Sequence, residues 1–201
     1  MTINHEKKLI FIHIPKNAGT SIIKAMGVEN LYMDKTIEEY KEHYQEYWNE
    51  YTKFTVVRDP IDRFISAYKF ARMKESGWFS ATGEEGLEKH HHYELCNELD
   101  INGYVKYVYD NKKEYNRWII PQTFIISNDK NEIEIDYFVR YENLLKDLKK
   151  IGIENIEKLN SSKVQDNKLI KLTRKSKDML HEIYDIDYQN FNYTKNIFSY
   201  H

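Results

Sequence analysis

In this chain of 201 residues, the stretch Leu9–Ser21, LIFIHIPKNAGTS, decides which fold is predicted. The segment 7–14 is almost continuously apolar from Leu9 onward and rich in β-branched residues, which favours a buried parallel strand. The run breaks at Pro15, and after Gly19 the apolar residues recur at helical spacing. The stretch therefore predicts a strand, a loop large enough to hold a phosphate, and a helix.

The loop carries groups that bind an anion. A helix N-terminus offers unpaired N–H groups and a partial positive charge, Lys16 adds a full charge, and Thr20 and Ser21 add hydroxyl donors. Gly19 allows the backbone to approach a ligand closely. The alternative for this loop on its own is an ordinary strand-to-helix turn with a threonine N-cap. A Walker loop is disfavoured, because the lysine precedes the glycine and no Gly-Lys-Ser/Thr occurs in the chain.

A second strand-to-helix unit follows, with the sequence TVVRDPIDRFISAY over Thr55–Tyr68. Arg58 stands at the carboxyl end of the strand, where open α/β sheets bind their ligands. Pro60 suits the first turn of the next helix, and Ser66 lies about two turns into it. Arg58 and Ser66 can therefore converge on a second phosphate, unless this is a surface helix that begins with an Asp-Arg pair.

The remaining elements alternate along the chain. A polar helix with an aromatic face is expected over 36–51, and a loop over 77–86. Further helices are expected over 99–109, 141–150 and 174–191, and strands over 124–126 and 137–140. This alternation predicts an α/β fold, a three-layer sandwich around a central parallel sheet, in a single domain over residues 1–201.

Composition narrows the classes of function. Hydrophobic residues make up 41% and charged residues 31%, which suits a folded domain. A net charge of −2 argues against a general nucleic-acid binder. The single cysteine, Cys96, excludes an intramolecular disulfide and any multi-cysteine metal site, and suits a reducing compartment. With no signal peptide core and no apolar run near the roughly 18 residues that span a bilayer, we expect a cytoplasmic protein, or one peripheral to a membrane.

Together, FIHIPKNAGTS and TVVRDPIDRFISAY resemble two motifs of sulfotransferases that use 3′-phosphoadenosine-5′-phosphosulfate (PAPS): the 5′-phosphosulfate loop and the 3′-phosphate motif. The nearest resemblance is to the carbohydrate branch, which includes heparan sulfate 2-O-sulfotransferase and small bacterial relatives. It continues more faintly through 121–123, 139–144 and 183–191, and implies a P-loop-like sulfotransferase fold.

The resemblance implies roles for the motif residues. Lys16 would be catalytic, in contact with the oxygen that bridges sulfate and phosphate. Arg58 and Ser66 would hold the 3′-phosphate, and Arg63 would lock this motif to neighbouring structure. The 5′-phosphate would be held by Asn17, Ala18, Gly19, Thr20 and Ser21, with Asn17 standing where the family usually has threonine.

Relatives also close a late basic loop over the nucleotide. Here Lys163, in Ser161-Ser162-Lys163, would take that place, with Arg174-Lys175 as the alternative. The resemblance implies PAPS as co-substrate, no metal, and a hydroxyl acceptor that is a saccharide.

An acceptor hydroxyl needs a general base, and relatives place a His or Glu between the two motifs. His43 is the leading candidate, and Asp34 or one of His90, His91 and His92 are alternatives. Each histidine also has a plainer interpretation: His43 as a packed or surface residue, and the run as a solvated stretch whose side chains diverge too far to share a metal ion. His13 is expected to be buried and hydrogen-bonded.

The charge is uneven along the chain. Residues 1–28, 51–74 and 160–180 carry net charges of +3, +4 and +4, and the remainder is acidic. This distribution suits local binding of a multiply charged nucleotide, and favours a neutral or lightly charged acceptor over a long polyanionic glycan.

Three functions are therefore considered. The first is a PAPS-dependent sulfotransferase, the second a P-loop-type nucleotide-dependent phosphotransferase, and the third a non-catalytic nucleotide-binding relative. The first is favoured, because Arg58 and Ser66 suit a 3′-phosphate that ATP lacks. No nucleic-acid partner is expected, and the sequence does not indicate the oligomeric state.

Overall fold

The computed structural model describes residues 2–28, 35–73, 76, 91–112, 116–154, 156 and 170–195. The chain divides into two compact units, each with its own hydrophobic core. The first unit comprises Met1–Asp59 and Ile120–Ser161, and the second comprises Pro60–Ile119 and Ser162–His201. The single domain over 1–201 stays a prediction.

The first unit is built on a sheet whose described strands follow the order β1-β2-β3-β4. The strands are β1 (Ile3–Asn4), β2 (Leu9–Ile12), β3 (Thr52–Val57) and β4 (Tyr137–Arg140). β2, β3 and β4 are parallel, with Ile12 opposite Thr55 and Val57 opposite Arg140. The predicted parallel sheet is therefore confirmed for β2, β3 and β4, but β1 runs antiparallel to β2, so the sheet is mixed. Two residues in a polar N-terminal stretch are too few to show a strand periodicity.

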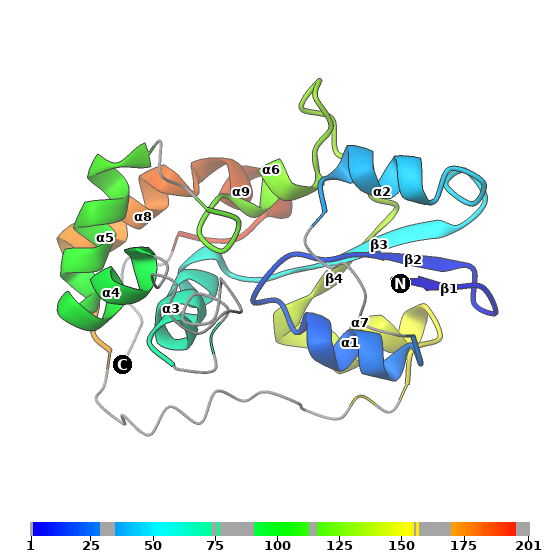
Figure 1. The fold of residues 1–201 in the computed structure, drawn as a ribbon, viewed down its shortest axis with the longest axis horizontal. Coiled ribbons are helices and arrows are strands. Elements are labelled where there is room, and N and C mark those ends of the chain that lie inside the picture. Colours follow the sequence, from blue (N-terminus) through cyan, green and yellow to red (C-terminus); the bar gives the residue numbers. More distant parts are fainter. Residues whose placement is uncertain are drawn as a thin grey trace, which may run out of the picture. The chain divides into compact units, whose positions relative to one another are not determined.

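Helices cover the sheet of the first unit, which is therefore an α/β structure, as predicted. On one face, α1 (Gly19–Ala25) and α7 (Leu144–Lys150) pack against the strands. This core joins Phe11, Phe54 and Val139 of the sheet to Ile22 of α1 and Leu148 of α7. On the other side of the sheet lies α2 (Ile37–His43) (Figure 1).

α2 is shorter than the helix predicted over 36–51. It begins with a capping box, in which the Thr36 hydroxyl accepts from the Glu39 N–H and the Glu39 carboxylate accepts from the Thr36 N–H. After His43 the chain continues in tight turns. Tyr40 and Trp48, which belong to the predicted aromatic face, are buried.

The strand predicted over 124–126 is wrong, because α6 (Gln122–Ile126) occupies this position. A run of three apolar residues cannot distinguish a strand from a buried helical turn. Pro121 precedes this helix directly, a position where its missing N–H costs no helical hydrogen bond.

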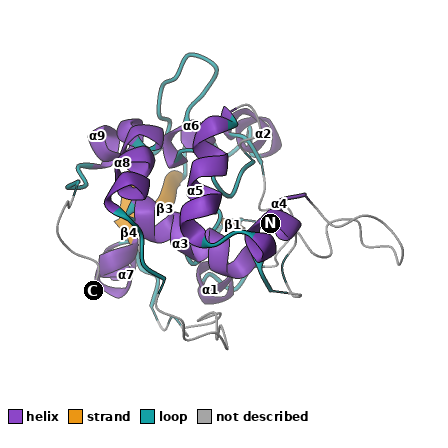
Figure 2. Cartoon of the chain, turned by 90° about the vertical axis from the view of Figure 1, so that its left-hand side faces the viewer, coloured by secondary structure: helices purple, strands orange, loops and turns teal. Residues whose placement is uncertain are grey.

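The described part of the second unit is helical, with the helices packed around one core. It contains α3 (Pro60–Ala71), α4 (His91–Glu98), α5 (Ile101–Asp110), α8 (Arg174–Ile183) and α9 (Asp185–Phe191). α8 packs along α5 (Figure 2). The helix predicted over 174–191 is two helices that meet at Tyr184, whose buried hydroxyl donates to the Ile119 carbonyl at 2.7 Å.

Arg63 and Cys96 are both buried in this unit, and Arg63 behaves as the resemblance implies. The Arg63 side chain is 1% exposed and donates to the Arg117 carbonyl at 3.0 Å, so it does lock the α3 motif to neighbouring structure. The Cys96 thiol is fully buried, and burial raises its pKa to about 12, which makes it an unreactive core residue.

Candidate active site

Three strands of the first unit end at one edge of the sheet, and the chain that leaves each of them carries polar residues. β2 leads into the loop 13–18, β3 leads into Arg58-Asp59, and β4 leads into the 3-10 helix η2 (Tyr141–Asn143). Because β2, β3 and β4 are parallel, these segments lie at the same edge. This edge is the candidate active site.

The loop after β2 has an unusual backbone. Lys16 has φ 72° and Ala18 has φ 63°, both in the left-handed region that costs a non-glycine residue about 1–2 kcal/mol. The Asn17 N–H closes a turn to the Ile14 carbonyl at 3.3 Å. Loops that alternate in this way form concavities that bind anions. Strain held at such a loop points to function, since a plain connection needs none.

The N-cap of α1 is Ala18, and its side chain offers no capping hydrogen bond. The alternative of a threonine N-cap is therefore wrong: Thr20 lies within the first turn of α1, where it is exposed. Ser21 is 5% exposed. The first turn of α1 thus begins without a side-chain acceptor from its N-cap.

Gly19 has a role that sequence reasoning missed. A Cβ atom at this position would lie 2.3 Å from both Cδ2 and Nε2 of His13. Contacts this short do not occur, so the glycine makes room for the imidazole at the start of α1. His13 itself is 7% exposed, as predicted, and its N–H lies 3.4 Å from the Tyr40 hydroxyl, which accepts from it.

Replacing Gly19 by alanine will therefore destabilise the protein, although alanine has a higher helix propensity than glycine. We expect a loss of about 1–3 kcal/mol in the free energy of unfolding, measured by urea titration, because the new methyl overpacks the His13 ring. In a His13→Ala background the same substitution should cost almost nothing. An equal cost in both backgrounds would show that the ring is not the obstacle.

Asn17 points into the protein rather than into the loop. Its side chain is fully buried, and Nδ2 donates to the Val56 carbonyl at 2.6 Å and to Gln122 Oε1 at 2.7 Å. The amide nitrogen of Asn17 is thereby used to tie the loop to β3 and α6. The role of Asn17 at a 5′-phosphate stays a prediction.

Arg58 bends toward the same loop. Its Nη1 donates to the Lys16 carbonyl at 3.2 Å, and its guanidinium carbon lies 4.1 Å from the centre of the Tyr141 ring. Stacking on an aromatic face holds the planar guanidinium in one orientation. Within the described residues, Arg58 Nε is buried without a hydrogen-bond partner. The structure therefore brings together Lys16 and Arg58, two of the predicted cations.

The carboxyl end of β4 supports this edge in two ways. Glu142 Oε1 accepts from the Asp59 N–H at 2.8 Å, which fixes the residue after Arg58. Asp147 Oδ2 accepts from the Arg140 N–H at 3.2 Å. The bond from Lys150 to Asp147 is the main cause that lowers the pKa of this carboxyl, so it stays charged and keeps its acceptors.

Sequence reasoning assigned no role to Gln122 or Tyr141, although both lie in the fainter parts of the resemblance. Gln122 is fully buried, and it contacts both the β2 loop and Arg58. The available signal was a glutamine directly after a proline and before an apolar run, which is an uncommon place for a buried amide.

The other predicted site residues lie in other elements of the chain or outside the described residues. Ser66 is partly exposed on α3, in the second unit, and its approach to a 3′-phosphate stays a prediction. His43 is exposed in the last turn of α2, with its ring 4.7 Å from that of Tyr44. Lys163, Asp34 and His90, together with the loop over 77–86, lie outside the described residues.

The histidine run is not uniformly solvated, so that prediction is wrong for one member. His92 is 3% exposed, and its Nδ1 lies 2.8 Å from the Tyr104 hydroxyl in the core of the second unit. His91 is exposed and lies 3.0 Å from the Tyr107 hydroxyl. Their placement on α4 turns one side chain inward and leaves the other outside.

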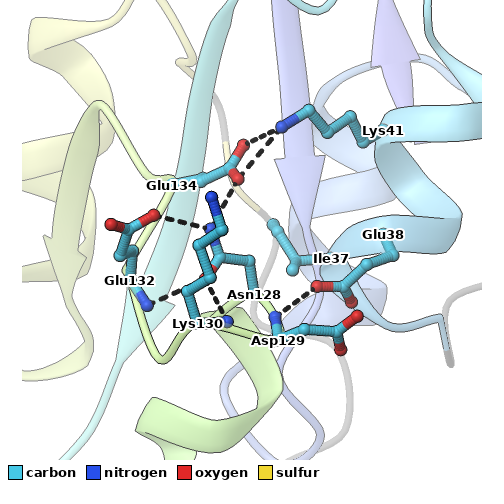
Figure 3. Close-up of a pocket in the computed structure, with 8 residues that line it drawn as sticks. All are labelled: Ile37, Glu38, Lys41, Asn128, Asp129, Lys130, Glu132 and Glu134. Atoms are coloured by element: carbon cyan, nitrogen blue, oxygen red, sulfur yellow. Dashed lines mark hydrogen bonds and ion pairs between the residues drawn. The ribbon is translucent and has the colours of Figure 1, made fainter.

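A polar pocket of about 330 Å³ lies between α2 and the loop after α6 (Figure 3). Several of its polar groups already bond to one another. Glu134 accepts from Lys41 at 2.9 Å and from Asn128 at 2.9 Å, which lowers the pKa of this carboxyl. Glu38 accepts from the Asp129 N–H at 2.9 Å. These mutual bonds explain the pocket as local structure.

No described helix is long and apolar enough to cross a membrane. No group of three or more His, Cys, Asp or Glu side chains within the described ranges could hold a metal ion.

Comparison with known proteins agrees with the two motifs. Carbohydrate sulfotransferase 9 of Homo sapiens is 24% identical over 172 residues, which cover 73% of this chain and 38% of the human protein. The chain thus spans well under half the length of that relative. No solved structure matches. The sequence model of the sulfotransferase family matches residues 1–194. Since that match covers nearly the whole chain, both units included, the chain belongs to the sulfotransferase family.

Proposed function

We propose that this protein transfers a sulfuryl group from PAPS to a hydroxyl of a saccharide. The observation that carries the proposal is the loop after β2, where Lys16 and Ala18 have left-handed backbones and the Arg58 guanidinium bonds the Lys16 carbonyl. Two cations at one strained loop suit a donor with several negative charges. The name of the human relative supports a carbohydrate acceptor.

The proposed reaction is an in-line displacement at sulfur. The acceptor oxygen attacks the sulfur as the bond from sulfur to the bridging oxygen breaks, and that oxygen leaves on the 5′-phosphate with the electron pair. Lys16 neutralises the charge that develops on the leaving oxygen. Positioning and charge stabilisation supply most of the catalysis in the related transfer of phosphoryl groups.

A general base takes the proton of the acceptor hydroxyl. Of the described candidates, His43 and His91 are exposed, so their side chains are accessible to an acceptor. His92 is buried in the core of the second unit. His43 remains our leading candidate, because it belongs to the segment between the two motifs. Lys163 remains the proposed residue that closes over the nucleotide.

The donor can be tested by thermal shift. We expect 3′-phosphoadenosine-5′-phosphate (PAP) at saturation to raise the melting temperature by several degrees, and ATP with Mg²⁺ to raise it much less, because ATP lacks the 3′-phosphate. A larger shift with ATP and Mg²⁺ would favour the phosphotransferase instead. Transfer of radiolabelled sulfate from PAPS to a panel of neutral and anionic glycans then separates an enzyme from a non-catalytic relative.

A further inference from the structure

The side chain of Gln122 connects two segments of the candidate active site, the β2 loop and Arg58. It is fully buried. Its Oε1 accepts from Asn17 Nδ2 at 2.7 Å and from the Arg58 N–H at 3.0 Å, and its Nε2 donates to the Arg58 carbonyl at 2.9 Å. One amide thus pairs both backbone groups of Arg58 and also holds a side chain of the β2 loop.

These bonds form a closed ring with the loop. Gln122 holds Asn17, the neighbouring Lys16 accepts from Arg58 Nη1 through its carbonyl, and the backbone of Arg58 returns to Gln122. Hydrogen bonds connected in this way strengthen one another, and each one lost loosens the rest. A buried amide or backbone group that loses its partner also has no water to replace it.

We propose that Gln122 is a positioning residue for the donor nucleotide, which holds the β2 loop and Arg58 in one fixed geometry before the nucleotide binds. The inference rests on the proposed function, since it assumes that these two segments bind the donor's phosphates. Preorganised donors bind an anion better because the protein does not pay to arrange them on binding. Gln122 itself touches no phosphate.

The test compares Gln122→Leu, which removes all three bonds, with Gln122→Glu, which keeps the acceptor and loses the donor. Gln45→Glu is the matched control, because Gln45 is an exposed glutamine of the same unit. The affinity for PAP is measured by calorimetry at 20 °C, where circular dichroism shows each variant to be folded. We expect Gln122→Leu to bind PAP about 10-fold or more weakly, Gln122→Glu to lie between it and wild type, and the control to be unchanged.

A second measurement uses the protein without nucleotide. The Asn17 N–H donates to Ile14 rather than to Gln122, so its hydrogen exchange reports the loop geometry and not the deleted bond. We expect this amide to exchange about 10-fold faster in Gln122→Leu than in wild type. In the Asn17→Ala background, Gln122→Leu should have a smaller effect on PAP affinity than in wild type, because the two side chains act together.

The outcomes distinguish a positioning role of Gln122 from a purely structural one, and distinguish a failure of this inference from a failure of the proposed function. A purely structural Gln122 would lower the melting temperature while PAP affinity at 20 °C stayed within twofold of wild type, and this result would overturn the inference. If Gln122→Leu fails to fold, Gln122→Glu decides by the same criterion. If wild type binds no PAP, the proposed function fails, and exchange at Asn17 still decides the positioning: faster exchange supports it and unchanged exchange overturns it.

Discussion

Replacing Lys16 by alanine will lower the rate of sulfuryl transfer at saturating PAPS and acceptor by roughly 100- to 1,000-fold. This is the usual effect of deleting one group that stabilises charge in a transition state. The change isolates the ammonium group, because alanine at φ 72° bears the same kind of backbone strain as lysine. The affinity for PAP should change much less than the rate, since the charge on the leaving oxygen develops only during the reaction.

The matched control is Lys24→Ala, which removes an exposed cation from the last turn of α1, the helix that follows the β2 loop. We expect its rate and its PAP affinity to stay within twofold of wild type. If Lys16→Ala transferred sulfate at the wild-type rate, Lys16 would not be the catalytic residue.

Replacing Arg58 by alanine will have its main effect on binding. The change removes a charged donor, the bond to the Lys16 carbonyl and the stack on Tyr141. We expect PAP to bind about 10- to 100-fold more weakly, which corresponds to hydrogen bonds from a charged group. Arg58→Lys should recover only part of this affinity, because lysine keeps the charge and loses the planar fork and the stack.

The control for this change is Lys149→Ala, which removes an exposed cation from α7 in the same unit. It tests whether overall charge, rather than the position of Arg58, determines the affinity. Equal losses in Arg58→Ala and Lys149→Ala, measured by calorimetry at the same ionic strength, would argue against a specific contact from Arg58.

Sequence reasoning located the parts of the fold that have strong local signals. The run into Pro15 and the run into Pro60 are each bounded by residues that end regular structure, so β2, β3 and the helices after them could be predicted. β1 is too short to show a period, and the apolar turn of α6 is too short to separate helix from strand. Both errors concern elements of five residues or fewer.

The candidate site was predictable only where its residues lie in the motifs. Lys16 and Arg58 follow strand ends and carry charge, so their type and place suffice to suggest anion binding. Gln122 lies 105 residues from Asn17 and 64 from Arg58, and no local pattern links such distant partners. His13 is similar, because its proximity to Gly19 depends on how the loop folds back.

The first unit is built from two separate segments of the chain, and this determines when the residues of the candidate active site come together. Lys16 and Arg58 are both synthesised within the first 59 residues of this unit, and the chain then builds 60–119 of the other unit before it returns at Ile120. Contacts between such distant residues must overcome the entropy of closing a long loop, so they form late in folding. A nascent chain that has not yet reached Gln122 and Glu142 therefore contains both motifs but lacks the side chains that hold Arg58 and Asp59 in place.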